Sequence, residues 1–146
     1  MKWQELMTTI VAVVWLTGCS TPEGPYVAVA NPKSPAAAGK PVVLLNHDLL
    51  RTLAVDQPVQ VDRDPVGRLR LQVGLRNRVD DENLQIQVQT LWMNDAGRVL
   101  YSQPGSETAW QTLTVSPNQT VYYSQTALTP EATKFSIRVR YTAKTR

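Results

Sequence analysis

Apolar and polar residues alternate with a period of two through much of the chain after residue 68. The alternation is clearest at residues 68–76, 84–92 and 135–141. Its apolar positions are Leu69, Leu71, Val73, Leu75, Leu84, Ile86, Val88, Trp92, Phe135, Ile137, Val139 and Tyr141. Successive side chains of a strand point to opposite faces, so the pattern predicts three strands, each with one buried and one solvated face.

Shorter candidate strands fill the intervals between and around these three. They lie at residues 53–61, 99–101, 110–115 and 120–125. Pro58 has no backbone N–H to donate, which places the first of them at a sheet edge or splits it. Turn-forming residues separate the candidates at 94–97, 104–106 and 116–118, and Gly97 can adopt a positive φ at a hairpin.

Seven short strands at regular spacing predict an all-β fold, a single antiparallel β-sandwich over residues 42–146. Nothing after residue 18 keeps a helical period for ten residues, although 46–53 or 129–133 could form one turn of helix. The chain has one cysteine, so no intrachain disulfide can join the two sheets. The apolar strand faces and Trp92 must therefore hold them together.

The first 18 residues have the three parts of a secretory signal: a polar start with Lys2, an apolar stretch, and small Gly18 before a cleavage point. The apolar stretch, Leu6–Leu16, is 11 residues long. A membrane-spanning helix needs about 20 residues. We therefore expect residues 1–18 to be a cleaved signal peptide.

Leu16-Thr17-Gly18-Cys19 is similar to the lipobox of bacterial lipoproteins. In that class the cysteine sulfur takes a diacylglyceryl thioether, and cleavage falls between Gly18 and Cys19. Two or three acyl chains give a stable anchor where one holds only marginally. By the sorting pattern of the class, Ser20 favours the outer membrane. We expect a lipid on Cys19 and a location at its periplasmic face.

Residues 19–41 join the expected anchor to the expected domain. Five prolines stand there among small and polar residues, at positions 22, 25, 32, 35 and 41. Such composition buries too little apolar surface to offset its ordering entropy, so we expect a flexible linker. The alternative is that Tyr26-Val27-Ala28-Val29 adds a short strand to the domain.

The net charge of the chain is +3. Loss of residues 1–18 would remove Lys2 and Glu5 and leave this charge unchanged. An excess this small lacks the concentrated basic footprint of a nucleic-acid-binding protein, so we expect no nucleic-acid partner.

The sequence offers no recognisable catalytic constellation and no metal or cofactor site. His47 is the only histidine, and it stands beside Asp48 in a predicted loop without a nucleophile placed near it. The acidic run at residues 80–82 could bind a divalent cation through oxygen ligands, but it is more simply a charged turn between two strands. We therefore expect a protein that is not an enzyme.

Outward-facing arginines form the candidate binding face. Alternation puts Arg68, Arg70 and Arg76 on one strand face, and Arg138 and Arg140 on another. If those strands share a sheet, the five guanidinium groups would form a stripe suited to phosphate or carboxylate. The alternative is a solvated face whose charges oppose aggregation.

Two further aromatic residues have open roles. Trp110, like Trp92, is expected in or near the core of so small a sandwich. An exposed Trp110 with Tyr122 would instead offer a platform for stacking carbohydrate.

The run from Leu84 to Val99 resembles the central hairpin of the YcfL-like family, small periplasmic lipoproteins with a domain of unknown function. Three other stretches match in order: Leu75-Arg76-Asn77, Trp110-Gln111-Thr112-Leu113 and the closing residues 127–140. The resemblance covers residues 42–141 and includes the lipobox, while Met93 replaces a more frequent aromatic residue. It implies an immunoglobulin-like or fibronectin-like sandwich without assigned activity or catalytic residues.

These observations predict a lipid-anchored, non-enzymatic binding or scaffolding module at the periplasmic face of the outer membrane. Its partner would be a periplasmic protein or an envelope component. The alternative function is recognition of peptidoglycan or lipopolysaccharide through the arginine stripe.

Overall fold

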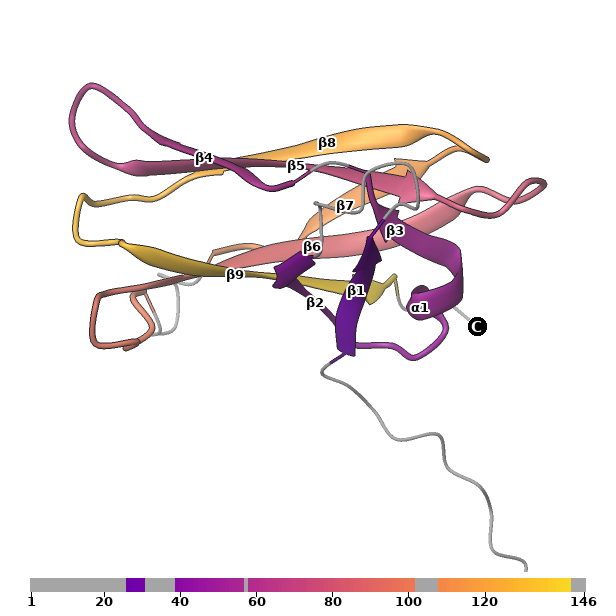
Figure 1. Cartoon of the computed structure of the whole chain (residues 1–146), viewed down its shortest axis with the longest axis horizontal. Coiled ribbons are helices and arrows are strands. Elements are labelled where there is room, and N and C mark those ends of the chain that lie inside the picture. Colours follow the sequence, from indigo (N-terminus) through magenta and orange to yellow (C-terminus); the bar gives the residue numbers. More distant parts are fainter. Residues whose placement is uncertain (1–25, 31–38, 57, 102–107, 143–146) are drawn as a thin grey trace, which may run out of the picture.

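The computed structural model describes residues 26–30, 39–56, 58–101 and 108–142. In this part of the chain there are nine strands and one short helix (Figure 1). They are β1 (Tyr26–Ala30), β2 (Gly39–Leu44), α1 (Leu49–Thr52), β3 (Leu53–Val55), β4 (Gln60–Arg63), β5 (Leu69–Asn77), β6 (Leu84–Met93), β7 (Gln111–Val115), β8 (Thr120–Thr126) and β9 (Lys134–Tyr141). The signal peptide and lipobox lie outside the described residues.

The strands form two packed sheets. Sheet A has the order β1-β2-β9-β6-β7. Sheet B has the order β1-β3-β5-β8, and β4 pairs with the same edge of β5 as β3 does, farther along the strand. All pairings are antiparallel except β1–β3 and β2–β9. This confirms the predicted β-sandwich, with nine described strands where about seven were expected.

Strand β1 belongs to both sheets. Its first residues, from Tyr26, pair with β2, and its last two, Val29 and Ala30, pair with β3. β1 therefore closes one side of the sandwich, while the other side ends at the edge strands β7 and β8. The linker expected over residues 19–41 is wrong for Tyr26–Ala30, where the alternative of an added strand holds, and for residues 39–41, which begin β2.

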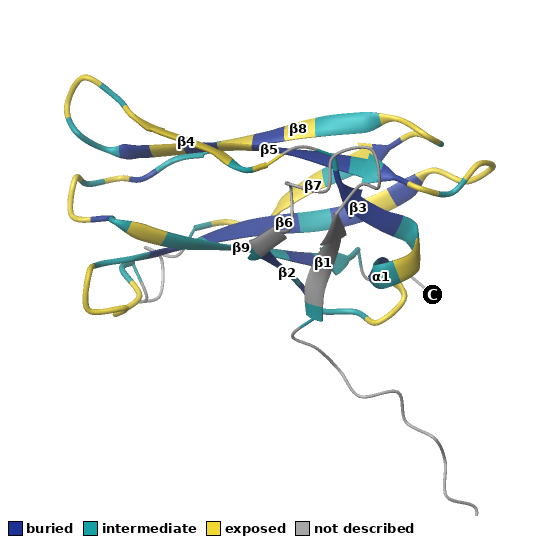
Figure 2. Ribbon diagram, in the orientation of Figure 1, coloured by how far each residue is buried: buried dark blue, intermediate teal, exposed yellow. Residues whose placement is uncertain are grey.

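The core lies between the sheets and follows the alternation of the sequence. In β5 and β6 the apolar positions are buried and most of the polar ones face solvent (Figure 2). Trp92 is 2% exposed, in agreement with its expected place in the core. The largest fully buried side chains are Trp92, Tyr123, Leu44, Leu49, Leu53, Leu71, Leu75, Ile86 and Ile137.

The three long strands are confirmed as β5, β6 and β9, and Pro58 separates β3 from β4. Residues 99–101 form no strand, because Val99 makes only an isolated bridge to Met93. The helical turn considered for 46–53 is present as α1, whereas 129–133 contains no helix. Gly97 has a φ of +76°, which agrees with the positive φ predicted for it in the turn at residues 94–97. Within the described residues, no helix is long and apolar enough to cross a membrane.

Candidate functional site

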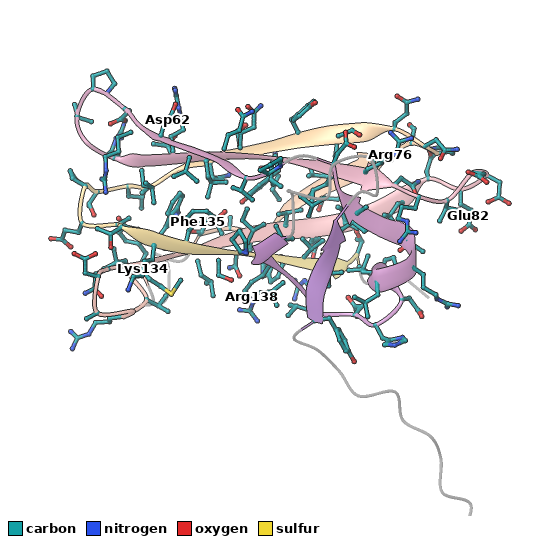
Figure 3. The ribbon with its side chains drawn as sticks, in the orientation of Figure 1. Asp62, Arg76, Glu82, Lys134, Phe135 and Arg138 are labelled. Atoms are coloured by element: carbon teal, nitrogen blue, oxygen red, sulfur yellow. The ribbon has the colours of Figure 1, made fainter. Side chains whose placement is uncertain are left out.

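The five arginines of the predicted stripe lie on different sheets. Arg70 and Arg76 are in β5 of sheet B, with Arg68 just before that strand, whereas Arg138 and Arg140 are in β9 of sheet A. The outer faces of a sandwich point in opposite directions, and Figure 3 shows Arg76 and Arg138 on opposite sides of the molecule. The single arginine face is therefore wrong, since it required both strands in one sheet.

Two of the sheet B arginines are held by carboxylates. Arg70 donates from Nε and Nη2 to the two carboxylate oxygens of Asp62, at 2.9 and 2.6 Å. Arg68 donates from Nε to Asp64 at 2.7 Å. The hydrogen bond from Arg70 lowers the pKa of Asp62, and Asp62 in turn raises the pKa of Arg70. These arginines stabilise the β4–β5 hairpin locally.

The pKa of Asp64 is also lowered. Burial of this carboxyl acts in the opposite direction, but hydrogen bonds from the Arg68 side chain and from the backbone of Arg68 and Val66 outweigh it together. The backbone bonds from Arg68 and Val66 reach Asp64 Oδ1 at 2.9 and 3.1 Å. Asp64 therefore serves the turn between β4 and β5, where Gly67 has a φ of +83°.

The sheet A arginines surround Trp110 instead. The guanidinium carbon of Arg140 lies 4.0 Å from the centre of the indole ring, and that of Arg138 lies 6.0 Å away. Attraction between a cation and an aromatic face operates at these separations. We call Trp110, Arg138 and Arg140 the Trp–Arg cluster.

Strand pairing positions this cluster. Arg138 stands opposite Gln89 of β6, and Arg140 stands opposite Gln87. Arg140 Nε donates to the side-chain oxygen of Gln87 at 2.9 Å. Gln89, buried on this face, donates from Nε2 to the backbone oxygen of Thr108 at 2.7 Å, which holds the chain leading to Trp110. Gln87 and Gln89 of β6 thus fix the positions of Arg140 and of the segment that carries Trp110.

The cluster borders a recess of about 360 Å³ in the outer face of sheet A. Its remaining walls combine apolar and polar side chains. They come from Leu45, Gln89, Thr90, Leu91, Val99, Leu100, Tyr101 and Thr108. A recess with apolar walls and two cations can hold a small anionic group together with an attached apolar or ring-shaped group.

Sheet A carries positive charge without negative charge. The strands β1, β2, β6, β7 and β9 contain no Asp or Glu. Among the described residues Arg138 and Arg140 form no ion pair, unlike Arg68 and Arg70. Guanidinium groups grip phosphate or carboxylate through paired N–H donors, so this face is suited to an anion.

A second recess, of about 450 Å³, lies where β7 and β8 meet at the open side of the sandwich. Its lining includes Trp92, Leu128 and Trp110. Gln125 bridges the two edge strands weakly, donating from Nε2 to Gln111 Oε1 at 3.5 Å. Trp110 therefore stands on the ridge between a cationic recess and a more apolar one.

The other sequence candidates do not gather into a site. His47 is exposed and makes an edge-on contact with Tyr26, the ring centres being 5.5 Å apart. In the acidic run, Asp80 accepts a hydrogen bond from Asn118 at 2.7 Å in an exposed turn. Within the described part of the chain, no group of three or more His, Cys, Asp or Glu is arranged to hold a metal ion.

Trp110 and Tyr122 form no common platform. Trp110 lies on the outer face of sheet A, and Tyr122, 52% exposed, belongs to β8 of sheet B. The expectation that Trp110 packs in or near the core is also wrong, because Trp110 is only partly buried and contacts the outward-facing Arg138 and Arg140. Tyr122 instead lies over Gly74, where an added Cβ would come within 3.3 Å of its ring.

A family model described as "Protein of unknown function (DUF1425)" matches residues 40–141. The chain belongs to the DUF1425 family. The matched range contains strands β3 to β9 in full, and so it includes the whole Trp–Arg cluster of this DUF1425 domain. No curated protein sequence matches the chain.

Two solved structures have a similar fold. The crystal structure of Campylobacter jejuni cj0090 is 22% identical with a TM-score of 0.58, and the match covers 70% of this chain and 98% of that one. A DUF1425 family member from Shewanella sp. pv-4 is 15% identical with a TM-score of 0.51, over 63% of this chain and 78% of the other. At these identities the likeness concerns the fold alone.

Sequence reasoning missed Gln87, Gln89 and Thr108 as parts of the site. Alternation already placed both glutamines on the outward face of β6, which was the available signal. The missing information was the pairing of β6 with β9, which brings glutamines and arginines together across the strands.

Proposed function

We propose that this DUF1425 protein is a lipid-anchored, non-enzymatic binding module at the periplasmic face of the outer membrane, and that it binds through the outer face of sheet A. The lipobox at Leu16–Cys19 and the resemblance to YcfL-like lipoproteins support the anchor and the location. The Trp–Arg cluster and its recess support the binding face.

One observation carries the choice of face. Arg138 and Arg140 lie on a sheet whose strands contain no carboxylate, whereas Arg68 and Arg70 on the other side are neutralised by Asp64 and Asp62. Two cations at an aromatic ring, with apolar walls beside them, give this face a positive charge that an anionic partner would neutralise. An acidic protein surface or an anionic envelope component fits this chemistry.

The anchor is tested on protein extracted from membranes. Mass spectrometry should find an N-terminal peptide that begins at Cys19 and carries a diacylglyceryl thioether. The Cys19→Ala variant should stay uncleaved at this point and carry no lipid. An unmodified Cys19 thiol in the membrane-extracted protein would contradict the proposal.

The binding face is tested by crosslinking in intact cells followed by capture of the protein and its partners. Arg138→Ala with Arg140→Ala should lose most of the captured material, since each charge-assisted hydrogen bond contributes about 1.5–3 kcal/mol and the affinity would fall at least about tenfold. Arg68→Ala with Arg70→Ala is the matched control on sheet B and should capture normally. Equal loss in both variants would contradict the assignment of the face.

The same pair of variants separates the candidate partners. Sedimentation with purified sacculi should recover the unaltered protein and not the Arg138/Arg140 variant if peptidoglycan carboxylates occupy the face. Recovery of neither protein, with an intact crosslinked partner, would assign the face to a protein or a lipid instead.

A further inference from the structure

The chain enters the sandwich close to the expected anchor. β1 begins at Tyr26, so only residues 20–25 separate it from Cys19. An extended chain spans at most about 3.6 Å per residue, which limits the distance from Cys19 to Tyr26 to about 25 Å. A lipid on Cys19 would therefore hold this sandwich against the membrane surface, not at the end of a long tether.

The entry point is on the sheet A side of the molecule. β1 starts on the side of β9 that faces away from sheet B, and it runs from there toward β3 (Figure 1). Arg138 extends from β9 on that same side (Figure 3). The short tether and the cationic face therefore share one side of the sandwich.

The distribution of charge favours the same orientation. The strands of sheet A carry Arg138, Arg140 and Lys134 without any acidic residue. On sheet B, Asp64 and Asp62 neutralise Arg68 and Arg70 in ion pairs. An anionic surface attracts each basic side chain without such a partner by about 1 kcal/mol, so Arg138 and Arg140 would turn sheet A toward it.

The residues around the arginines suit an interface between water and lipid. Trp110 is partly exposed beside Arg140, and Val99 is 37% exposed at the rim of the recess. Tryptophan is enriched at the depth of lipid headgroups, because its ring is apolar while its N–H still needs a polar partner.

We propose that the outer face of sheet A rests on the anionic phospholipid headgroups of the membrane that holds the anchor. Arg138 and Arg140 contact headgroup phosphates, and Trp110 lies at headgroup depth. The inference rests on the proposed function, since it requires the lipid on Cys19. It leaves sheet B, with its paired charges, facing the aqueous side.

Tryptophan fluorescence tests the proposal in the lipidated protein. The chain has four tryptophans, and cleavage after Gly18 would leave Trp92 and Trp110. Trp92 is 2% exposed, so a quencher in the lipid should reach Trp110 alone. The protein is reconstituted into vesicles of brominated phosphatidylcholine, with or without phosphatidylglycerol. We expect phosphatidylglycerol to bring loss of the Trp110 share of the emission.

Three variants give the controls, each checked for an unchanged unfolding midpoint. Trp110→Phe should show no quenching and defines the baseline of Trp92. Arg138→Ala with Arg140→Ala should keep its full Trp110 emission when phosphatidylglycerol is added, because loss of the two charges would lower the surface affinity about thirty-fold. Arg70→Ala with Arg76→Ala, on sheet B, should be quenched like the unaltered protein.

A Trp110 emission that phosphatidylglycerol leaves unchanged would overturn the inference. So would quenching that persists in the Arg138/Arg140 variant. Mass spectrometry of the same sample separates this failure from that of the proposed function. Absence of the lipid on Cys19 would contradict the proposed anchor itself. A lipidated protein whose Trp110 stays unquenched, but whose crosslinked partners still depend on Arg138 and Arg140, would show that the outer face of sheet A binds a protein instead of lipid.

Discussion

Asn77 is a fully buried polar side chain at the end of β5. Its Nδ2 donates to the backbone oxygens of Glu82 and Val115, at 2.8 and 3.0 Å, and its Oδ1 accepts from the backbone N–H of Val79 at 2.9 Å. One side chain thus shapes the turn between β5 and β6 and ties it to the end of β7. A buried amide with this many partners is costly to lose.

The substitution Asn77→Ala should destabilise the fold by about 2–3 kcal/mol, because it leaves buried backbone groups without partners. Urea unfolding measures the loss. Asn83→Ala, at an exposed position of the same turn, is the control and should change the stability by less than about 0.5 kcal/mol. Equal effects of the two substitutions would show that the Asn77 hydrogen bonds contribute little.

A second buried polar contact crosses the core. The hydroxyl oxygens of Thr90 in β6 and Tyr123 in β8 lie 3.0 Å apart, which joins the inner faces of sheets A and B. Burial raises the pKa of Tyr123, so the phenol stays protonated as a hydrogen-bonding group.

Tyr123→Phe should cost about 1 kcal/mol of stability, since it leaves the Thr90 hydroxyl buried without its partner. Adding Thr90→Val removes the orphaned hydroxyl, so the double variant should be less destabilised than the sum of the single ones. Urea unfolding of all four proteins gives the coupling. Strict additivity would mean that the two hydroxyls do not interact.

At the scale of elements, the sequence predicted the strands that alternate, offered β1 only as an alternative and missed β2. β5, β6 and β9 alternate over eight or more residues. β1 and β2 are short, lie among prolines and small residues, and are stabilised by pairing with strands distant in sequence. The prediction of a single arginine stripe was wrong for the same reason, because the order of the strands in a sheet depends on tertiary packing and not on the local sequence pattern.

The β4–β5 hairpin makes a prediction about pH. Arg70 holds the pKa of Asp62 below its ordinary value of 3.8, so the folded state binds this proton less readily than the unfolded chain. The stabilisation is therefore present above the unfolded pKa and is lost as the pH falls through the folded one.

Unfolding of the unaltered protein and of Asp62→Asn, measured from neutral pH down to strongly acidic pH, should show this directly. The unaltered protein should be the more stable of the two at neutral pH, and the difference should vanish on acidification. High salt should also reduce the difference, because the pair is exposed. A stability difference independent of pH would exclude the contribution of the Asp62 charge.

At the scale of the whole molecule, the two outer faces of the sandwich differ in how their charges are paired. Sheet A presents cations around an aromatic ring, whereas Arg68 and Arg70 on the sheet B side are paired with carboxylates. β1 joins the sheets and brings the start of the domain to within seven residues of Cys19. The charge of sheet A and the position of β1 thus support the proposal that this face binds the partner.

Site-specific photocrosslinking in cells tests this central claim most directly. A photoreactive residue replaces Thr112, which is exposed on β7 of sheet A beside Gln87, or Ser124, which is exposed on β8 of sheet B. We expect reproducible adducts with an envelope lipid or protein from position 112 and none above background from position 124. Adducts from position 124 alone would contradict the account.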